Sequence, residues 1–435
     1  MGMVDVFAFA VAALAFALSI WIAIPGPVLP LFVVTVAVTE LWPLFALLNV
    51  AALAIASYSR TPARPVAIIL SAAALLCTLL PPTAYLIAGQ RVPLSALLSS
   101  SRPLPAALRA DAPVMFEIYG GSWENGFRQK DAALNAVIAS WGYRVIPLDY
   151  RHAPGARWPA QINDILAQID AVRAPHVAIL GHSSGAQLAV IAAARRPRLE
   201  ALITYESPVD LDLGYRFPSE PDIINARRVI SGLCGGTPQD RPACYRSASP
   251  RYAIHTGMPP TLMIVAGRDH VVNVDLEHLL RDEFRSAGVA VTYVELPWAD
   301  HAFETVTFGF HSRIALWHLR RFLNARFPPA PADQTQRQAC CLSSSGAESS
   351  DSRTNWSIDS CSAFPMCVNA MPCKYSCRDP SKKDITAVPR STISLTVPGN
   401  ENRKAMAVPR ARVAGPDMRI PLRLRSLARP ARTTF

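Results

Sequence analysis

Residues 177–194 read VAILGHSSGAQLAVIAAA, a short apolar run followed by a Gly-His-Ser-Ser-Gly pentapeptide and an apolar stretch of helical character. A strand followed by Gly-x-Ser-x-Gly and then by a helix predicts a very sharp turn, in which the central serine has a strained backbone conformation. Gly181 and Gly185 supply the small residues that such a turn needs on either side. The order therefore predicts that Ser183 is presented at the carboxyl end of a sheet. The alternative is a helix N-cap, a role that Ser184 can fill equally well.

Short apolar runs alternate with helical patterns on both sides of this stretch. Six runs predict strands, at residues 114–119, 143–148, 177–180, 201–205, 261–266 and 289–296. Apolar residues recur at helical spacing in three of the intervening segments, at 134–141, 158–169 and 276–284. This alternation predicts an α/β fold, in which a mostly parallel sheet carries helices on both faces.

Two further residues are predicted to join Ser183. A serine hydroxyl is a weak nucleophile until a base takes its proton, and that base needs a carboxylate to fix its tautomer. Asp269 comes just after one predicted strand and His301 just after the next. Because the carboxyl ends of parallel strands meet at one edge of a sheet, we expect the three side chains to converge there.

Other residues compete for the same roles. His270 is the main rival for the base, but its position beside Asp269 on a turn makes a productive contact with that carboxylate difficult. Asp210 and Asp300 are rival acids. His182 directly precedes Ser183, so the geometry of the turn predicts that it points away and is structural.

Acyl transfer also needs N–H donors aimed at the oxygen that becomes negatively charged. The strand at 114–119 is followed by Gly120-Gly121-Ser122-Trp123, whose flexible backbone can turn N–H groups toward Ser183. We expect Gly120, Gly121 and the backbone N–H of Ser184 to form this oxyanion hole. The alternative is an ordinary Gly-Gly turn.

Charge and hydropathy divide the 435 residues into three predicted regions, 1–88, 89–327 and 328–435. Hydrophobic residues make up 51% of the chain and charged residues only 17%, which excludes a wholly disordered protein. The net charge of +11 belongs mostly to the last region, where residues 331–435 alone carry +8. The basic balance therefore does not indicate a nucleic-acid surface on the folded part, and no nucleic-acid partner is expected.

Residues 1–88 predict a membrane region, in contact with lipid, of about three helices. Residues 6–24 form an uncharged apolar run of 19 residues, long enough to cross a hydrocarbon core. Glu40 and Pro43 interrupt a second apolar stretch, which leaves 41–58 as its spanning part, and a third runs over about 66–88. A cleavable signal peptide is the alternative for the first run, but no Lys or Arg precedes it.

The orientation of these helices is open from the sequence. Arg60 and Arg64 lie between the second and third runs, and positive loops stay cytoplasmic, which predicts an extracytoplasmic position for residues 89–327. Arg91, Arg102 and Arg109 follow the last run and favour the opposite orientation. A disulfide between Cys234 and Cys244 would agree with an oxidising compartment, and two free thiols are the equal alternative.

The last region, 328–435, is predicted to be a disordered basic tail. It is rich in Ser, Pro and Arg, has no sustained helical or strand period, and contains six of the nine cysteines. None of these six lies in a Cys-x-x-Cys pair, so a zinc site is not expected there.

The middle region resembles the alpha/beta-hydrolase esterases of the hormone-sensitive-lipase and feruloyl-esterase-like (BD-FAE-like) group. The resemblance rests on the positions of Asp269 and His301 and on six stretches: Tyr119-Gly120-Gly121-Ser122-Trp123, Asp149-Tyr150-Arg151-His152-Ala153-Pro154, Trp158-Pro159-Ala160, Gly181-His182-Ser183-Ser184-Gly185, Ala248-Ser249-Pro250 and Pro259-Pro260-Thr261. One departure is Tyr119, which stands where the family usually has the histidine that orders the oxyanion loop. The resemblance implies an alpha/beta-hydrolase fold between membrane helices and a disordered tail.

The resemblance also implies an activity, the hydrolysis of small carboxylic esters through Ser183, His301 and Asp269, without a cofactor or catalytic metal. Three alternatives stay open. The Gly-Gly-Ser-Trp loop also resembles that of arylformamidases, which cleave amides, and an acyltransferase uses the same triad. The third alternative is a membrane-tethered binding protein that keeps the fold without catalysis. The oligomeric state is unknown.

Overall fold

The computed structural model describes residues 3–60, 62–98 and 111–328. Its centre is a six-stranded sheet in the order β2-β1-β3-β4-β5-β6, and every neighbouring pair is parallel. The strands are β1 (Val114–Ile118), β2 (Arg144–Leu148), β3 (Val177–His182), β4 (Ala201–Tyr205), β5 (Thr261–Ala266) and β6 (Val291–Leu296). Parallel strands need crossover connections, and the intervening helices provide them.

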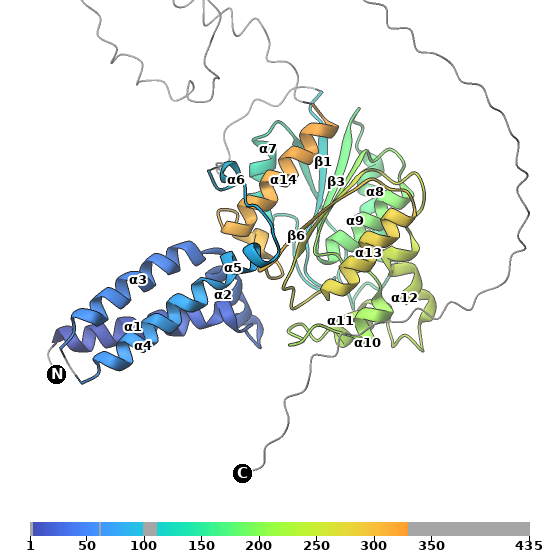
Figure 1. Cartoon of the computed structure of the whole chain (residues 1–435). Coiled ribbons are helices and arrows are strands. Elements are labelled where there is room, and N and C mark those ends of the chain that lie inside the picture. The colour runs from blue at the N-terminus through green and yellow to red at the C-terminus, as the bar shows by residue number, and fades with distance from the viewer. Residues whose placement is uncertain (1–2, 61, 99–110, 329–435) are drawn as a thin grey trace, which may run out of the picture. The chain divides into compact units, whose positions relative to one another are not determined.

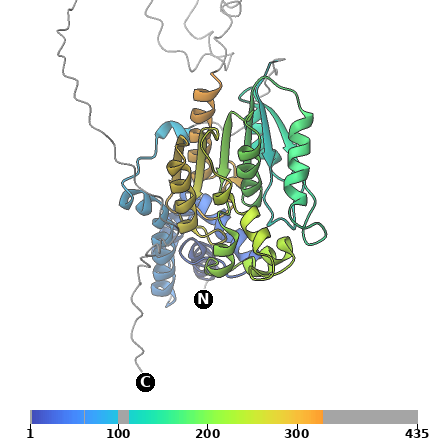
Figure 2. The ribbon, with the colours of Figure 1, turned by 90° about the vertical axis from the view of Figure 1, so that its right-hand side faces the viewer.

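Helices cover both faces of this sheet (Figures 1 and 2). One face packs on α8 (Ala160–Ala171), α9 (Ser184–Arg195) and α13 (Val274–Ser286) around a core that includes Phe116, Ile162 and Leu188. The other face packs on α7 (Ala132–Ala139) and α14 (Phe310–Arg326) around Met115, Ile138 and Leu319. The predicted alpha/beta-hydrolase fold class and all six predicted strands are therefore confirmed, with shifts of one or two residues at their ends.

Three short helices lie together at one end of the sheet (Figure 1). They are α10 (Leu211–Arg216), α11 (Ala226–Cys234) and α12 (Pro242–Ala248), and they share a small core of their own. Cys234 and Cys244 form a disulfide that joins α11 to α12. Of the two alternatives for this cysteine pair, a disulfide or two free thiols, the structure contains the disulfide.

The first region is helical. It consists of α1 (Met3–Ala23), α2 (Leu29–Glu40), α3 (Trp42–Tyr58), α4 (Arg64–Thr78) and α5 (Leu80–Ile87), and α6 (Leu94–Leu98) follows. By length and composition, Val6–Ala23 and Arg64–Ile87 can each cross a membrane, and α2 and α3 add a third span if the pair, bent by 83°, counts as one. The bend lies between Glu40 and Pro43, where the sequence predicted the interruption.

One side chain of this region contacts the middle region directly. The buried Glu40 carboxylate accepts the backbone N–H groups of His311 and Ser312 at 3.0 and 3.1 Å, and lies 2.6 Å from His311 Nδ1. Glu40 therefore satisfies N–H groups in the first turn of α14 that have no partner within the helix. The predicted boundaries at residues 88 and 327 stay a prediction, and the tail from residue 329 lies outside the described residues.

Candidate active site

The turn after β3 has the strained geometry that its sequence predicted. Ser183 has a φ of 50°, a left-handed conformation that is unusual for a residue other than glycine. A Cβ added to Gly181 would lie 2.3 Å from the carbonyl oxygen of Gly185, and one added to Gly185 would lie 2.2 Å from that of Ile118. No larger residue fits at either position, so the two glycines permit the turn that exposes Ser183 at the carboxyl end of the sheet.

The structure brings Ser183, His301 and Asp269 together. His301 Nε2 lies 3.0 Å from Ser183 Oγ, and His301 Nδ1 lies 2.8 Å from Asp269 Oδ2. With the proton on Nδ1 donated to Asp269, Nε2 is free to accept the hydroxyl proton of Ser183. Three residues that span 118 positions of the chain are thus joined in the order that proton transfer from serine requires.

The surroundings of His301 hold it in place and tune its basicity. Asp269 Oδ1 accepts the N–H groups of Val271 and Val272, both at 2.7 Å, which leaves Oδ2 to face the imidazole. Burial is the largest single effect and disfavours the charged imidazole, but the charge and hydrogen bond of Asp269, together with the charges of Glu304 and Asp300, outweigh it, so the pKa of His301 is raised above its usual value. His301 is therefore a stronger base than an isolated histidine.

The Gly-Gly loop after β1 lies against the nucleophile. A Cβ added to Gly120 would lie 2.9 Å from Ser183 Cβ, so only glycine allows this approach. The Gly121 N–H donates to Ser184 Oγ at 3.1 Å, and Lys130 Nζ donates to the carbonyl oxygen of Gly120 at 2.8 Å. The loop that was predicted to supply the oxyanion donors is therefore beside the Ser183 hydroxyl, held from both sides.

Tyr119 fills the position where the family usually has histidine. Its hydroxyl donates to Asp149 Oδ1 at 2.6 Å and lies 3.0 Å from His152 Nε2, while its ring stacks on Tyr150 with the centroids 4.7 Å apart. Asp149 and His152 both belong to the second stretch of the resemblance. Tyr119 thus connects the start of the Gly120-Gly121 loop to residues 149–154. It does so through a phenol group, where the family usually has an imidazole.

The rival residues have other partners. His270 Nδ1 lies 2.7 Å from Asp300 Oδ2, so these two rivals pair with each other. Asp210 caps α10 by accepting the N–H groups of Asp212 and Leu213. In the described part of the chain, neither His270 nor Asp210 forms a hydrogen bond or ion pair with Ser183 or His301.

Sequence reasoning missed one carboxylate at the site, Glu206. It follows β4 directly, its Oε2 accepts the Ala302 N–H at 2.7 Å, and the same oxygen lies 3.4 Å from His301 Nδ1. Burial, and then the carboxylates of Glu304 and Asp269, raise the pKa of Glu206 well above its usual range. The rule that found Asp269, a carboxylate just past a predicted strand, also applies to Glu206.

A cavity of about 60 Å³ opens beside Ser183, and Ser122, Trp123 and Ser184 form part of its wall. The remaining wall is mainly apolar and includes Leu211, Phe217, Ile224, Val229, Ile230, Val272 and Leu276. Five of these seven residues belong to the segment between Asp210 and Ser249 that carries the disulfide. This segment therefore shapes the space next to the reacting hydroxyl.

Two buried groups among the described residues have ligand atoms close enough to hold a metal ion. One is Glu206, Asp269 and His301, in which His301 already faces Ser183. The other is Glu117, Asp131 and His182, the residue that directly precedes Ser183. His182 is buried and bonded through Nδ1 to Glu304 Oε1 at 3.1 Å, so it points away from the Ser183 hydroxyl as predicted.

Comparisons with known proteins give the same family as the motifs. The BD-FAE family model matches residues 103–284. Esterase LipC of Mycobacterium tuberculosis (strain ATCC 25618 / H37Rv) is 28% identical over 215 residues, which are 44% of this chain and 53% of LipC. Probable carboxylic ester hydrolase LipM of the same strain is 29% identical over 218 residues, 45% of this chain and 51% of LipM. The chain thus spans about half the length of each of these curated relatives.

A similar solved structure is esterase B from Lactobacillus rhamnosis, with 20% identity and a TM-score of 0.45 over 60% of this chain and 94% of that one. This similarity rests on the family model and the two relatives, together with the parallel sheet and the glycine-flanked serine turn found here. The middle region of this chain is therefore similar to the alpha/beta-hydrolase esterases.

Proposed function

We propose that this protein is a membrane-anchored serine hydrolase that cleaves carboxylic esters through an acyl-enzyme on Ser183. The observation that carries the proposal is the position of His301, 3.0 Å from the Ser183 hydroxyl through Nε2 and 2.8 Å from Asp269 through Nδ1. The relatives named esterase and carboxylic ester hydrolase support the same reaction class.

In this proposal the reaction has two halves. His301 takes the proton of Ser183 while Oγ attacks the ester carbonyl, and the protonated His301 then gives that proton to the leaving alcohol. In the second half, His301 deprotonates a water molecule that attacks the acyl-enzyme, and the proton returns to Ser183 as the acid leaves. Asp269 stabilises the imidazolium in both halves without being protonated itself.

The developing oxyanion needs N–H donors, and two are near. The N–H of Ser184 lies in the first turn of α9, where helix N–H groups have no partner within the helix. The N–H of Gly121 donates to Ser184 Oγ in this structure, so it must exchange that hydroxyl for the substrate oxygen during the reaction. We therefore assign Gly121 and Ser184 as donors, and Gly120 as the residue whose missing side chain leaves room for them.

The N-terminal helices are the proposed membrane anchor. Arg268, next to Asp269 in the chain, donates from Nη1 to the carbonyl oxygen of Ile22 at 2.7 Å and from Nη2 to that of Ala23 at 2.5 Å. Trp298 Nε1 also donates to the Ile22 oxygen, at 3.1 Å. Tryptophan and arginine are common where a helix leaves a bilayer, so these contacts support a position of the loops near the membrane surface.

An extracytoplasmic position of the middle region is also part of the proposal. The Cys234–Cys244 disulfide supports it, because such a bond persists in an oxidising compartment. Arg60, between α3 and α4, and Arg64, the first residue of α4, support it through the preference of positive loops for the cytoplasm.

The proposed substrates are esters with a short acyl group. The cavity beside Ser183 is small and its wall is mainly apolar, so it favours an acetyl or butyryl group over a long acyl chain. A series of p-nitrophenyl esters, with N-formylkynurenine assayed beside them, measures both acyl preference and the amide alternative.

The decisive experiment replaces the nucleophile. In the full chain purified in detergent, Ser183→Ala should lower p-nitrophenyl butyrate hydrolysis by about 10⁵-fold or more, because no other group can form the acyl-enzyme. Labelling by a fluorophosphonate should be lost as well. Ser184→Ala is the matched control, since it removes the neighbouring hydroxyl and keeps the backbone donor. Wild-type turnover by Ser183→Ala would reject the assignment, and an unlabelled wild-type protein would favour a non-catalytic role.

A further inference from the structure

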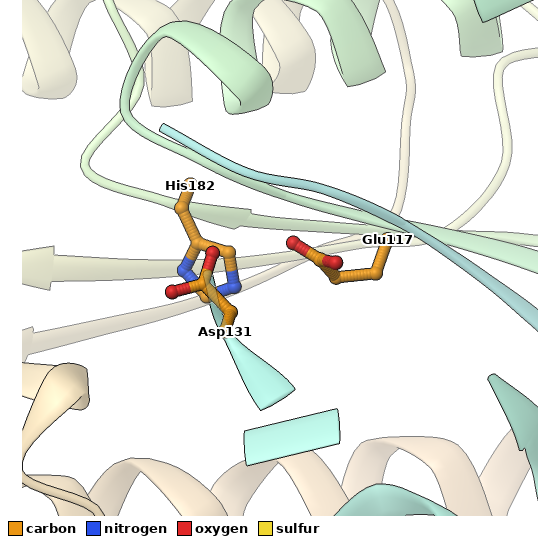
Figure 3. Close-up of side chains that lie close together, drawn as sticks. All are labelled: Glu117, Asp131 and His182. Carbon is orange, nitrogen blue, oxygen red and sulfur yellow. The ribbon is translucent and has the colours of Figure 1, made fainter. Parts of the chain in front are cut away.

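Three buried side chains form a second cluster of chemistry-bearing groups. Glu117 lies on β1, Asp131 directly precedes α7, and His182 ends β3. Their relative exposures are 0%, 8% and 3%, and one potential ligand atom from each lies within 4.8 Å of the other two. Figure 3 shows the Glu117 carboxylate pointing toward the His182 ring, with the Asp131 carboxylate also directed at that ring.

Each of the three offers a buried atom with no hydrogen-bond partner among the described residues. These atoms are Glu117 Oε1, Asp131 Oδ2 and His182 Nε2. Buried polar atoms are almost always bonded, because leaving one unbonded costs about 1–3 kcal/mol. Glu117 and Asp131 are also close enough to share a hydrogen bond, so either a proton held between the two carboxyl groups or a bound cation completes the cluster.

Neighbouring groups hold the other ends of two of these side chains. His182 Nδ1 is bonded to Glu304 Oε1 at 3.1 Å, and Glu117 Oε2 accepts from Asn135 Nδ2 at 3.0 Å. A histidine that binds a metal through one nitrogen usually donates its other N–H to a carboxylate, which fixes the tautomer and the ring. The outer contacts of the cluster thus match those of a metal site.

We propose that Glu117, Asp131 and His182 bind one divalent transition-metal cation, Zn²⁺ or Mn²⁺. Two carboxylate oxygens and one imidazole nitrogen form a donor set that these ions accept, with a position left for a further ligand. A dication also neutralises two carboxylates that otherwise face each other in the interior.

The position of the cation defines its role. Glu117 lies shortly before the Gly120-Gly121 loop, Asp131 lies shortly after it, and His182 is joined directly to Ser183. A bound cation therefore ties both ends of the loop to the nucleophile turn and has a structural function. It contacts no reacting atom, so the inference does not depend on the proposed esterase reaction.

The test measures metal directly. The full chain, without an affinity tag, is expressed in medium supplemented with Zn²⁺ and Mn²⁺ and purified in detergent without chelators, because a buried site fills during folding. Elemental analysis should find about one of these ions per chain. Removal with a strong chelator should lower the melting temperature by about 5–10 °C, the shift expected for a ligand at roughly a hundred times its Kd.

Substitutions locate the ion. Glu117→Gln and Asp131→Asn keep size and shape but remove a ligand charge, so the metal content should fall at least tenfold. Glu304→Gln should weaken binding by about 10- to 100-fold through the histidine tautomer. Glu206→Gln, in the other buried group, and Glu200→Gln, beside His176 on the surface, are the matched controls and should retain the ion. Ser183→Ala should retain it too, even where ester hydrolysis is lost.

Two results would overturn the proposal. The first is wild-type protein with less than about a tenth of an ion per chain and no change in melting temperature on chelation. Glu117→Gln would then be as stable as wild type or more so, because glutamine mimics a carboxyl group that holds a proton in place of a metal. The second is an ion retained by Glu117→Gln and Asp131→Asn alike, which would place it elsewhere in the chain.

Discussion

Two buried clusters near the nucleophile turn have the same composition. His301 lies with Asp269 and Glu206 in the first cluster, and His182 lies with Asp131 and Glu117 in the second. Each histidine has one nitrogen bonded to a carboxylate. The partner of His301 is Asp269, and the partner of His182 is Glu304, a neighbour of the second cluster. The composition of a buried cluster therefore does not distinguish a catalytic histidine from a structural one.

The difference lies at the second nitrogen. His301 Nε2 faces the Ser183 hydroxyl, which also lines the cavity, whereas His182 Nε2 has no hydrogen-bond partner among the described residues. An imidazole acts as a general base only where its free nitrogen reaches a proton that the reaction must move. The turn at Ser183 produces this asymmetry, because the nucleophile and the residue before it point to opposite sides.

The largest expected effect comes from the carboxylate of the first cluster. Asp269→Asn should lower kcat for p-nitrophenyl butyrate by about 10⁴-fold, because an amide can no longer hold His301 in the tautomer that accepts from Ser183. The melting temperature serves as the control for folding. A loss below tenfold would show that another carboxylate, Glu206 first of all, orients the imidazole.

The pH dependence of the wild-type enzyme reports the same cluster. His301 must be neutral to accept a proton, and its pKa is raised above 6.5 because Asp269, Glu304 and Asp300 together outweigh the opposing effect of burial. The value of kcat/KM should therefore reach half its maximum above pH 6.5, and below that midpoint fall about tenfold per pH unit. In Asp269→Asn the residual activity should have its midpoint at lower pH, since burial then dominates. A midpoint below pH 6 in the wild type would contradict this.

Much of this arrangement was predictable from local sequence. Gly181 and Gly185 around a serine, between a strand and a helix, indicate one particular turn, and the rule that parallel strands end at one edge brings Asp269 and His301 to it. Short apolar runs located all six strands, four of which are buried along their whole length. These features depend on neighbours in the chain or on a general rule of topology.

The remaining features depend on contacts between distant segments. Tyr119 reaches Asp149, 30 positions away, and Glu40 reaches His311, 271 positions away. Tyr119 and Asp149 lie in two motifs, but neither motif reveals that their side chains meet, and no motif marks Glu40 or His311. Glu206 is a different case. Its position directly after a predicted strand was visible in the sequence, but the orientation of its side chain toward His301 was not.

The equivalent substitution in the second cluster tests the comparison directly. Asp131→Asn should lower kcat less than about tenfold at a temperature well below unfolding, because Asp131 has no contact with Ser183 or His301 among the described residues. Any effect should come from the position of the oxyanion loop. A loss near that of Asp269→Asn would mean that the second cluster takes part in proton transfer, and the contrast between the two histidines would be wrong.

The smallest effect is expected from Glu206→Gln. Burial and the neighbouring Glu304 and Asp269 raise the pKa of Glu206, which favours its protonated form, and glutamine reproduces that neutral group and its bond from the Ala302 N–H. The value of kcat should therefore stay within about threefold of wild type. In the Asp269→Asn background the same change should cost more, because Glu206 is then the nearest carboxylate to His301 Nδ1. A double-mutant cycle on kcat measures this coupling, and strictly additive effects would exclude Glu206 as a substitute acid.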